Sequence, residues 1–239
     1  MGIYQKFVLP HLVHLACGQR PMQRQRAKVV PQAEGLVLEV GMGSVHNLPF
    51  YDSTAVTAVL GIEPAAEMLD KATASARSSA LTLHRLRAIG EQIPLADRSV
   101  DTVVFTFTLC TIPDTGPALA EVVRVLRPGG RMLFCEHGLA PDANVRGWQR
   151  RLNPLWQRLA GGCNLDRDIP AMIGAAGFDM ERMETMYLPG WKPASVKYCG
   201  CARPRSYRGA RTRGVALAPL VNIVCGWNEP SWRPSCRYY

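Results

Sequence analysis

The sequence predicts an α/β fold in which a mostly parallel sheet is flanked by helices. From residue 35 onward, short β-rich runs alternate with helical stretches, which is the pattern of consecutive βαβ units. In addition, the apolar run 36–40 leads into the turn Gly41-Met42-Gly43, and a second apolar run ends on Glu63 about twenty residues later. This spacing is typical of a parallel sheet whose strand ends hold a nucleoside cofactor.

The size and composition of the chain fit one such domain with a short extension. It has 239 residues, of which 47% are hydrophobic and 20% are charged. These values are ordinary for a globular protein and argue against wholesale disorder. Residues 1–30 are expected to form one or two amphipathic helices that cap the domain, with Pro10 and Pro21 as breaks.

The elements after this cap follow from hydrophobic periodicity and from glycine and proline signals. Strands are expected at 36–40, 57–62, 82–88, 100–107 and 131–135. Helices at 67–78 and 116–126 should cover the sheet, and Pro128-Gly129-Gly130 should end the second of them. Helices at 144–160 and 169–176, followed by an antiparallel pair at 179–188 and 195–202, complete about seven strands.

The formal charge of +9 is unevenly distributed along the chain. Beyond Arg203 six arginines face a single glutamate, a net charge of +5, so most of the excess lies in the tail. A smaller cluster, Arg20, Arg24, Arg26 and Lys28, could touch phosphate or an anionic membrane, but a solvated helix face is the simpler interpretation. A basic tail alone gives only salt-sensitive, nonspecific binding, so no specific nucleic-acid partner is expected.

The cysteines and apolar runs indicate a cytoplasmic protein. Eight cysteines without a CxxC pair or regular spacing predict neither a zinc site nor a disulfide framework. Pro10, His11 and His14 interrupt the N-terminal apolar run, so a signal peptide is not expected. The apolar run 215–227 is well short of the roughly 20 residues that cross a bilayer, and no membrane span is predicted.

The glycine turn and Glu63 together suit a nucleoside. Gly41 and Gly43 lack Cβ atoms, so the main chain can approach a ligand closely, and the Glu63 carboxylate offers two acceptors for two vicinal hydroxyls. Glu39, inside the first motif, can balance a positively charged amino group of the cofactor. With Glu39, the motif resembles an S-adenosylmethionine (SAM) site more than a nicotinamide site.

Several stretches carry a more specific resemblance. They are LEVGMGSVHNLPFY, GIEP at 61–64, the segment 90–114 with TLCTIPD, EVVRVLRPGGRMLFCEHG at 121–138, and GGCNLDRDI at 161–169. In these the chain resembles class I SAM-dependent methyltransferases, and more narrowly the methyltransferase-like 7 thiol methyltransferases and the related ubiquinone/menaquinone C-methyltransferases. The resemblance spans nearly all of residues 1–203 and leaves the tail 204–239 unmatched.

The resemblance implies a Rossmann-like sheet in the order 3-2-1-4-5-7-6 with the last strand antiparallel, and it assigns residues to SAM. Beside Glu39, it places Gly41, Met42, Gly43 and Asn47 along the methionine part, Glu63 at the ribose, Gly90 and Glu91 near adenine, and Thr108 and Leu109 at the sulfonium. Ile89 stands where many relatives carry an acid, so adenine would be recognised mainly by backbone groups.

Val45 departs from the pattern of the relatives, in which a third glycine occupies this position. A β-branched residue resists positive φ and brings methyl groups toward the ligand. If the local φ is negative the change is tolerable, and if it is positive the site is strained. The sequence leaves both alternatives open.

Glu136 and His137, at the end of the fifth strand, are the candidates for catalysis, because a neutral imidazole suits removal of a proton from an acceptor. The pair could equally orient the following helix. His46 is a further candidate contact. Cys163 and Asp168 are expected to roof the acceptor pocket, with Cys163 as a packed residue rather than a nucleophile.

We therefore expect a SAM-dependent methyltransferase acting on a small, apolar acceptor, with a thiol as first choice and a quinone precursor or lipid amine as others. The alternative is a non-catalytic SAM-fold binding protein with an impaired glycine loop. The expected organisation is a helical cap at 1–30, a methyltransferase domain at 31–203 and a basic tail at 204–239 that is either disordered or unrelated to the family. A monomer is favoured, and peripheral membrane contact is left open.

Overall fold

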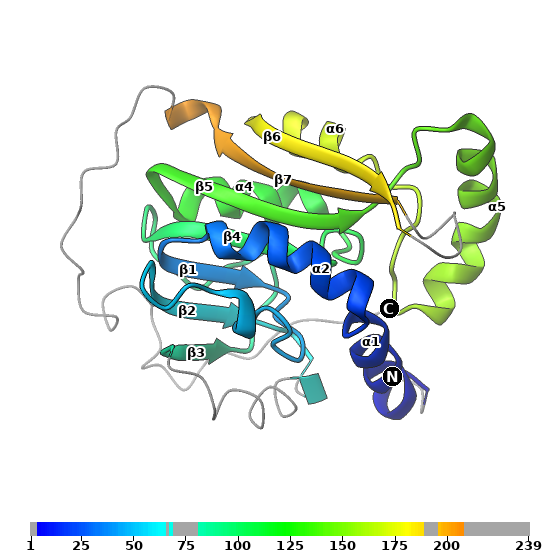
Figure 1. The fold of residues 1–239 in the computed structure, drawn as a ribbon, viewed down its shortest axis with the longest axis horizontal. Helices are drawn as coiled ribbons and strands as arrows, with labels where there is room; N and C mark the ends of the chain where they lie inside the picture. Colours follow the sequence, from blue (N-terminus) through cyan, green and yellow to red (C-terminus); the bar gives the residue numbers. More distant parts are fainter. Residues whose placement is uncertain (1–3, 66, 69–80, 189–195, 208–239) are drawn as a thin grey trace.

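The structure is a computed structural model and describes residues 4–65, 67–68, 81–188 and 196–207. Its centre is a seven-stranded sheet with the order β3-β2-β1-β4-β5-β7-β6 (Figure 1). The strands are β1 (Gly35–Val40), β2 (Val56–Ile62), β3 (Leu83–Leu86), β4 (Val100–Thr106), β5 (Leu126–His137), β6 (Phe178–Tyr187) and β7 (Val196–Pro204). β1 to β5 are parallel, and β7 runs antiparallel to both β5 and β6. The predicted strand order is confirmed.

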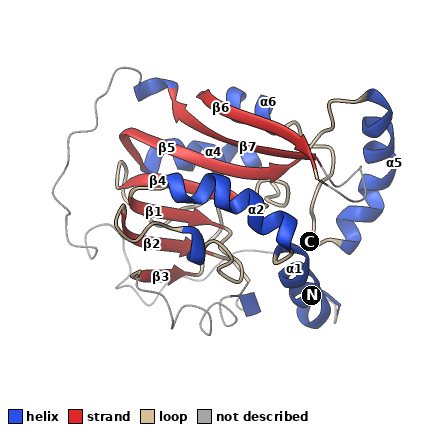
Figure 2. Cartoon of the chain, in the orientation of Figure 1, coloured by secondary structure: helices blue, strands red, loops and turns tan. Residues whose placement is uncertain are grey.

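Helices lie on both faces of the sheet, as Figure 2 shows. They are α1 (Leu9–Cys17), α2 (Arg20–Val29), α4 (Thr115–Val125), α5 (Ala143–Leu159) and α6 (Ile169–Ala175), with single turns at Tyr4–Val8, Val30–Gln32, Leu48–Phe50 and Arg205–Tyr207. α4 and α6 pack on one core, which includes Phe105 and Phe134, and α2 packs on the other. Most of the helix expected at 67–78 lies outside the described residues.

The N-terminal prolines begin helices instead of interrupting them. Pro10 and Pro21 lie in the first turns of α1 and α2, where the missing N–H group costs nothing. The break between the two helices falls at Gly18 and Gln19. Figure 1 shows α1 and α5 beyond the carboxyl ends of the parallel strands, where they flank the site described below.

β5 starts five residues earlier than expected, because the chain enters the sheet directly from α4. Leu126 pairs with Val100, the register then shifts, and the ladder resumes at the pair Thr102 and Arg131. The Pro128-Gly129-Gly130 segment fills this irregularity, with Gly129 at φ 86°. α4 ends at Val125 with Leu126 as its C-cap, within one residue of the predicted end, and Pro128 lies two residues beyond this cap.

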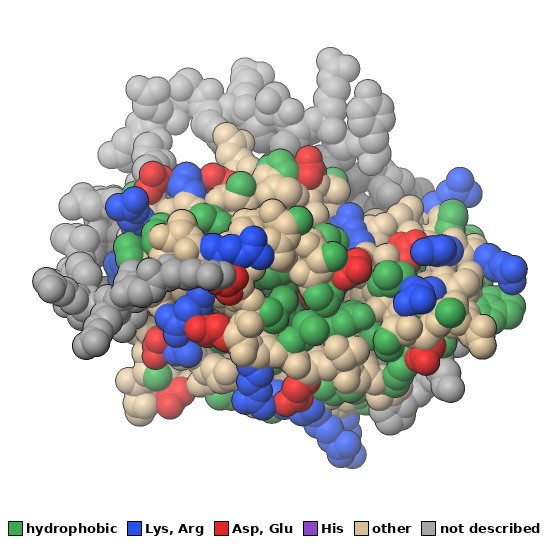
Figure 3. All heavy atoms as spheres, turned by 90° about the horizontal axis from the view of Figure 1, so that it is seen from above, with side chains coloured by type: hydrophobic (Ala, Val, Ile, Leu, Met, Phe, Trp, Pro, Cys, Tyr) green, Lys and Arg blue, Asp and Glu red, His purple; other side chains and the backbone are tan. Residues whose placement is uncertain are grey.

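Ordered packing continues a few residues past Arg203. Pro204 pairs with Phe178 at the end of β7, Arg205 Nε lies 3.0 Å from Asp179 Oδ1, and Tyr207 packs against the larger core. On the face in Figure 3, basic and acidic side chains are interspersed. The basic tail from residue 208 lies outside the described residues. Within the described part, no helix is long and apolar enough to traverse a bilayer.

Candidate functional site

The glycine loop after β1 has the open backbone that the sequence predicts. Gly41 and Gly43 have φ values of 69° and 51°, which favour glycine. A Cβ at Gly41 would lie 2.3 Å from Thr108 Cγ2, so glycine is required where the loops after β1 and β4 approach each other. Among the described residues, a Cβ at Gly43 would meet Met68 Cε at 3.3 Å. The Met42 side chain is buried in the core, so only its backbone can face a ligand at this loop.

Glu63 joins the glycine loop to the end of β2. Its Oε2 accepts a hydrogen bond from Gly43 N at 3.1 Å, and its Oε1 accepts one from Ala65 N at 3.0 Å. Burial raises the pKa of this carboxyl, while the two backbone N–H groups oppose the rise. A carboxylate has about four lone-pair sites, so two acceptors remain for hydroxyl groups of a ligand.

Glu39 lies in a buried polar chain beneath the loop. Its carboxylate accepts hydrogen bonds from Asn47 Nδ2 at 2.9 Å and from the Tyr51 hydroxyl at 2.7 Å, and Arg26 Nε donates to Asn47 Oδ1 at 3.0 Å. Burial raises the pKa of Glu39 to about 7, opposed by the Tyr51 hydrogen bond and the Arg26 charge. The sequence did not indicate Tyr51 as a partner of Glu39.

Arg26 corrects the expectation of a solvated basic face on the second helix. Only 3% of Arg26 is exposed, and besides Asn47 its Nη1 donates to Cys17 O at 2.6 Å. Its guanidinium also lies 4.9 Å from the centre of the Phe107 ring. Arg24, on the same helix, is exposed as predicted. Arg26 thus joins α1, α2 and the glycine loop.

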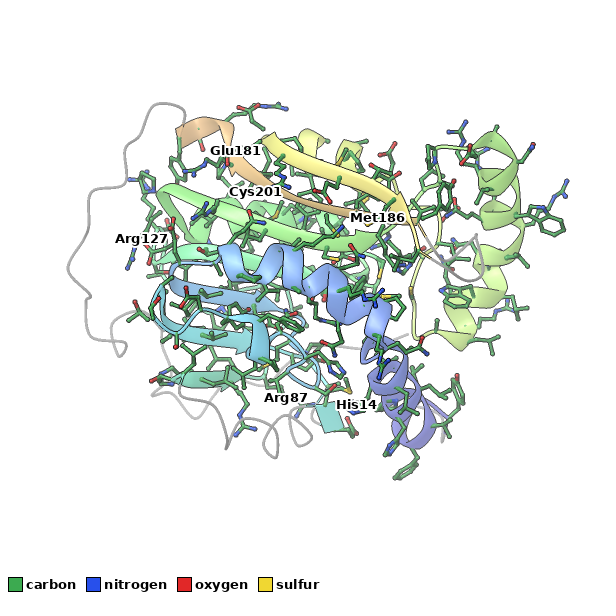
Figure 4. The ribbon with its side chains drawn as sticks, in the orientation of Figure 1. His14, Arg87, Arg127, Glu181, Met186 and Cys201 are labelled. Atoms are coloured by element: carbon green, nitrogen blue, oxygen red, sulfur yellow. The ribbon has the colours of Figure 1, made fainter. Side chains whose placement is uncertain are left out.

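The N-terminal helix contacts the glycine loop through two histidines. His14 Nδ1 lies 2.7 Å from Ser44 Oγ, and His46 Nε2 lies 3.1 Å from His14 O, with the two rings stacked 4.7 Å apart. Burial and the nearby Arg26 charge lower the pKa of His46 to about 4, so this ring is neutral at neutral pH. Figure 4 shows His14 on α1 close to the loop. His46 therefore belongs to the contact between cap and loop.

Val45 has a φ of 57° and is buried. Of the two alternatives left by the sequence, the structure shows the strained one. A β-branched residue in the left-handed region is an outlier that costs about 1–3 kcal/mol and persists only where surrounding packing holds it. The side chain packs in the smaller core with Val37 and Met42. Strain in the loop is thus offset by burial of the side chain.

The adenine-side residues and the loop after β4 lie next to the ends of β1 and β5. A Cβ at Gly90 would lie 3.2 Å from Val40 Cγ1, so this glycine is packed beside the end of β1. Glu91 lies in the tight turn where Ile89 pairs with Gln92, and it is partly exposed. The positions of Gly90 and Glu91 near the end of β1 are compatible with contact to adenine, and that contact stays a prediction.

Glu136 holds the loop that follows β4. Its Oε1 accepts hydrogen bonds from Thr108 N at 2.7 Å and Leu109 N at 3.0 Å, and the residue is 0% exposed. Its Oε2 has no hydrogen-bond partner among the described residues. Burial raises the pKa of Glu136 to about 7 against the pull of these N–H groups. This geometry indicates a positioning role for Glu136 on Thr108 and Leu109.

His137 belongs to a cluster with two cysteines, which we call the Cys-His cluster: Cys110, His137 and Cys163. His137 Nε2 lies 3.2 Å from Cys163 Sγ and 2.9 Å from Asn164 O, and the two sulfur atoms lie 3.7 Å apart. The Cys110 thiol and the His137 charge lower the pKa of Cys163, whereas that of Cys110 is raised well above its usual value. The sequence indicated His137 and the position of Cys163, but it did not indicate Cys110.

Arg167 is a further residue that sequence reasoning missed. Its Nη1 donates to Leu109 O and to Ile112 O, the latter at 2.6 Å, and so it fixes the loop after β4 from the segment after α5. Arg167 belongs to the matching string GGCNLDRDI, but nothing in that string says which backbone it contacts. Asp168, from the same string, accepts from Ala171 N at 3.1 Å and caps α6.

Comparisons with known proteins agree with this geometry. A family described as "Methyltransferase domain" matches residues 38–134. Human "Thiol S-methyltransferase TMT1B" is 33% identical over 220 residues, which cover 84% of this chain and 89% of that protein. Human "Thiol S-methyltransferase TMT1A" is 36% identical over 163 residues, and the match covers 66% of each protein. The chain thus spans just under two thirds of TMT1A.

Among solved structures, a SAM-dependent methyltransferase from Methanosarcina mazei has a TM-score of 0.56 to this chain. The similarity covers 72% of this chain and 93% of that one, at 19% sequence identity. At this identity the similarity concerns the fold alone.

Proposed function

This chain belongs to the SAM-dependent methyltransferases, and from that premise we propose that it methylates a small apolar thiol. The observation that carries the thiol is the 33% identity with a human protein named as a thiol S-methyltransferase, over 89% of that protein's length. A thiol has an ordinary pKa near 8.5, so it needs help with deprotonation at neutral pH. A partly exposed imidazole at the end of β5, His137, is placed to give that help.

The residues present fit SAM. Gly43 and Glu63 lie side by side at the ends of β1 and β2, and the Glu63 carboxylate has lone pairs beyond its two backbone hydrogen bonds. The Glu39 chain lies beneath the same loop and supplies a buried acid near the site. When bound, SAM supplies an electrophilic methyl group on a sulfonium. We propose that Glu39, the glycine loop with Asn47, Glu63, Gly90, Glu91, Thr108 and Leu109 hold it, with Glu136 fixing the last two.

We propose that residues 1–30 act as a cap on the donor site. His14 contacts Ser44, and Arg26 contacts Asn47, so α1 and α2 each touch the glycine loop. The methyltransferase domain then extends to about Tyr207, a few residues beyond the boundary expected from the sequence, because the turn at Arg205–Tyr207 packs on the core.

A second candidate function rests on Val45. Its positive φ favours a protein that keeps the fold and binds SAM poorly or without turnover. Quinone precursors and lipid amines remain alternative acceptors for the active enzyme, since acceptor choice in a shared fold is set by local site residues.

Calorimetric titration of SAM and its demethylated product into the full chain, Val45→Gly and Glu63→Gln separates these functions. We expect micromolar binding by the first two. Glu63→Gln should bind roughly 30- to 150-fold more weakly, because charged hydrogen bonds worth about 2–3 kcal/mol are lost. The amide Glu34→Gln, at the opposite end of β1, is the matched control. Binding by Val45→Gly alone would favour the non-catalytic protein.

The acceptor is then identified by mass spectrometry of reactions with an alkyl thiol, a quinol and a primary amine. Methylation of the thiol at the highest kcat/KM supports the proposal. Preferential methylation of the quinol or the amine would replace the thiol with that acceptor, while SAM binding without any methylation would favour the binding protein.

A further inference from the structure

The Cys-His cluster brings three soft donors together from three separate segments. Cys110 follows β4, His137 ends β5, and Cys163 lies in the connection after α5. Their donor atoms all lie within 4.8 Å of one another, and neither cysteine is in a disulfide. Thiolate and imidazole are the ligands that zinc and related soft metals prefer.

The distances in the cluster resemble those of a tetrahedral metal site. Two thiolates at zinc bonding distance stand about 3.8 Å apart, and a thiolate and an imidazole nitrogen about 3.6 Å apart. The corresponding distances here are 3.7 Å between the sulfur atoms and 3.2 Å between Cys163 Sγ and His137 Nε2. Coordination requires the His137 tautomer with its proton on Nδ1, so the contact of Nε2 with Asn164 O would be exchanged for the metal bond.

The backbone around the cluster is already fixed. Cys110 O accepts hydrogen bonds from Asn164 N at 2.8 Å and from Asn164 Nδ2 at 3.0 Å, which ties the Cys110 loop to the segment that carries Cys163. Arg167 and Glu136 hold the neighbouring Leu109 from either side. Little reorganisation is therefore needed to bring the ligands together.

Three protein ligands leave one coordination position open, as in catalytic zinc sites. Cys110 is buried, whereas His137 and Cys163 are partly exposed, so the open position lies on the accessible side of the cluster. Lys197 is 2% exposed, and burial lowers its pKa against the electrostatic pull of both cluster thiols, Cys135 and Glu136. A divalent ion with two thiolates is neutral, and a third thiolate adds one negative charge that Lys197 can balance.

We propose that Cys110, His137 and Cys163 bind a zinc-class divalent ion whose open position takes the acceptor thiol as a thiolate. Coordination breaks the S–H bond, forms a metal–sulfur bond and releases one proton to solvent, with no change in oxidation state. The metal site stands on the geometry of the cluster, while its role toward the acceptor rests on the proposed function. In the metal-bound protein His137 is a ligand, and coordination takes over the deprotonation assigned to the imidazole. The zinc site that cysteine spacing did not predict thus arises from the fold.

Cobalt(II) titration of the reduced full chain tests the site without any turnover. We expect one equivalent to bind, with tetrahedral d–d bands and a sulfur-to-cobalt charge-transfer band. Cys110→Ser and Cys163→Ser should each weaken binding by more than the roughly 10- to 100-fold that loss of a second-shell partner costs. Cys201→Ser is the matched control. Cys201 is also buried, on β7 beside Glu181 (Figure 4), with its Sγ 3.4 Å from Glu181 Oε2.

An alkyl thiol added to the cobalt protein should intensify the charge-transfer band and release one proton, detected with a pH indicator. Circular dichroism establishes that each variant is folded, and zinc content of the purified wild-type chain gives a second readout that needs no variant. Absence of binding by the reduced wild-type chain, or a band unchanged in both cluster variants, would overturn the metal site. The latter result would identify an adventitious ion only.

A cobalt band that does not respond to thiol would overturn the acceptor role. Thiol methylation at an unchanged rate after the metal is removed by a chelator would also overturn the acceptor role, but it would leave the proposed function standing. A third outcome is a protein that binds the metal at the cluster and binds SAM but methylates no thiol. It would remove the proposed function and the acceptor role with it, and would leave the metal site supported by its spectrum.

Discussion

The proposed donor side of the site, formed by Gly41, Gly43 and Glu63, contrasts with the proposed acceptor side, formed by the Cys-His cluster. On the donor side, Glu63 and Gly43 are 20 positions apart and joined by a direct hydrogen bond. On the acceptor side, Cys163 reaches His137 across 26 positions and Cys110 across 53. A short-range motif fixes the donor side, whereas only the packing of three distant segments creates the acceptor side. The two sides should therefore respond independently to substitution.

The largest expected effect separates the two sides directly. His137→Gln removes a group that either takes the acceptor proton or binds the metal, so kcat should fall by about 10²- to 10⁴-fold. SAM affinity should stay within about twofold, because the hydrogen bonds of His137 within the described residues go to Asn164 and Cys163 and not to the glycine loop or Glu63. Steady-state kinetics and calorimetry check the two quantities. His11→Gln, at an exposed position on α1, is the control. Equal losses of kcat and SAM affinity would show that the two sides act as one unit.

The same contrast explains which site residues could be predicted from the sequence. Gly41, Gly43 and Glu63 were predictable, because a glycine turn after one strand and an acid after the next must meet at the same edge of a parallel sheet. The strand order came with the family resemblance. Cys110 could not be assigned in the same way, since its partner Cys163 comes from a connection whose path depends on Asn164 and Arg167. Side chains brought together by such a connection leave no periodicity in the sequence.

Arg26 tests whether the donor side is as local as its motif. It is buried on α2 and supports Asn47 and Cys17 O from outside the motif. Arg26→Leu removes one buried donor from each of these acceptors and should lower the free energy of unfolding by about 2–4 kcal/mol. Arg24→Leu, two residues earlier and exposed, should change it by less than about 0.5 kcal/mol. Urea unfolding gives both values, and similar effects of the two substitutions would mean that Arg26 is solvated as the sequence suggested.

The buried acid Glu39 should make the free energy of unfolding depend on pH. Burial raises its pKa from 4.5 to about 7 in the folded protein. Between these values the folded protein binds more protons than the unfolded chain, so the contribution of Glu39 to stability is lost as pH rises from about 4.5 to 7. Glu39→Gln removes this titration and should flatten the pH dependence of the unfolding free energy by about 1–3 kcal/mol.

Unfolding by urea at about pH 5 and about pH 7.5 measures this difference. Glu34→Gln is the control, because Glu34 is half-exposed and pairs with Arg131 at the opposite end of the strand. A pH dependence identical in wild type and Glu39→Gln would show that the folded protein does not shift the titration of Glu39.

The smallest expected effect concerns Val45, where the donor side departs from its own motif. At a position with negative φ, a protein with alanine is more stable than one with glycine by about 0.5–1 kcal/mol. At a position with positive φ this preference is reversed. Because Val45 has a φ of 57°, Val45→Gly should be more stable than Val45→Ala by about 1 kcal/mol. The same pair of substitutions at Val59, a buried position within β2, should show the ordinary order. Thermal unfolding of the four variants decides between strain and its absence. If alanine is the more stable residue at both positions, the loop carries no strain. The third glycine of the relatives would then serve close approach to the cofactor instead of backbone conformation.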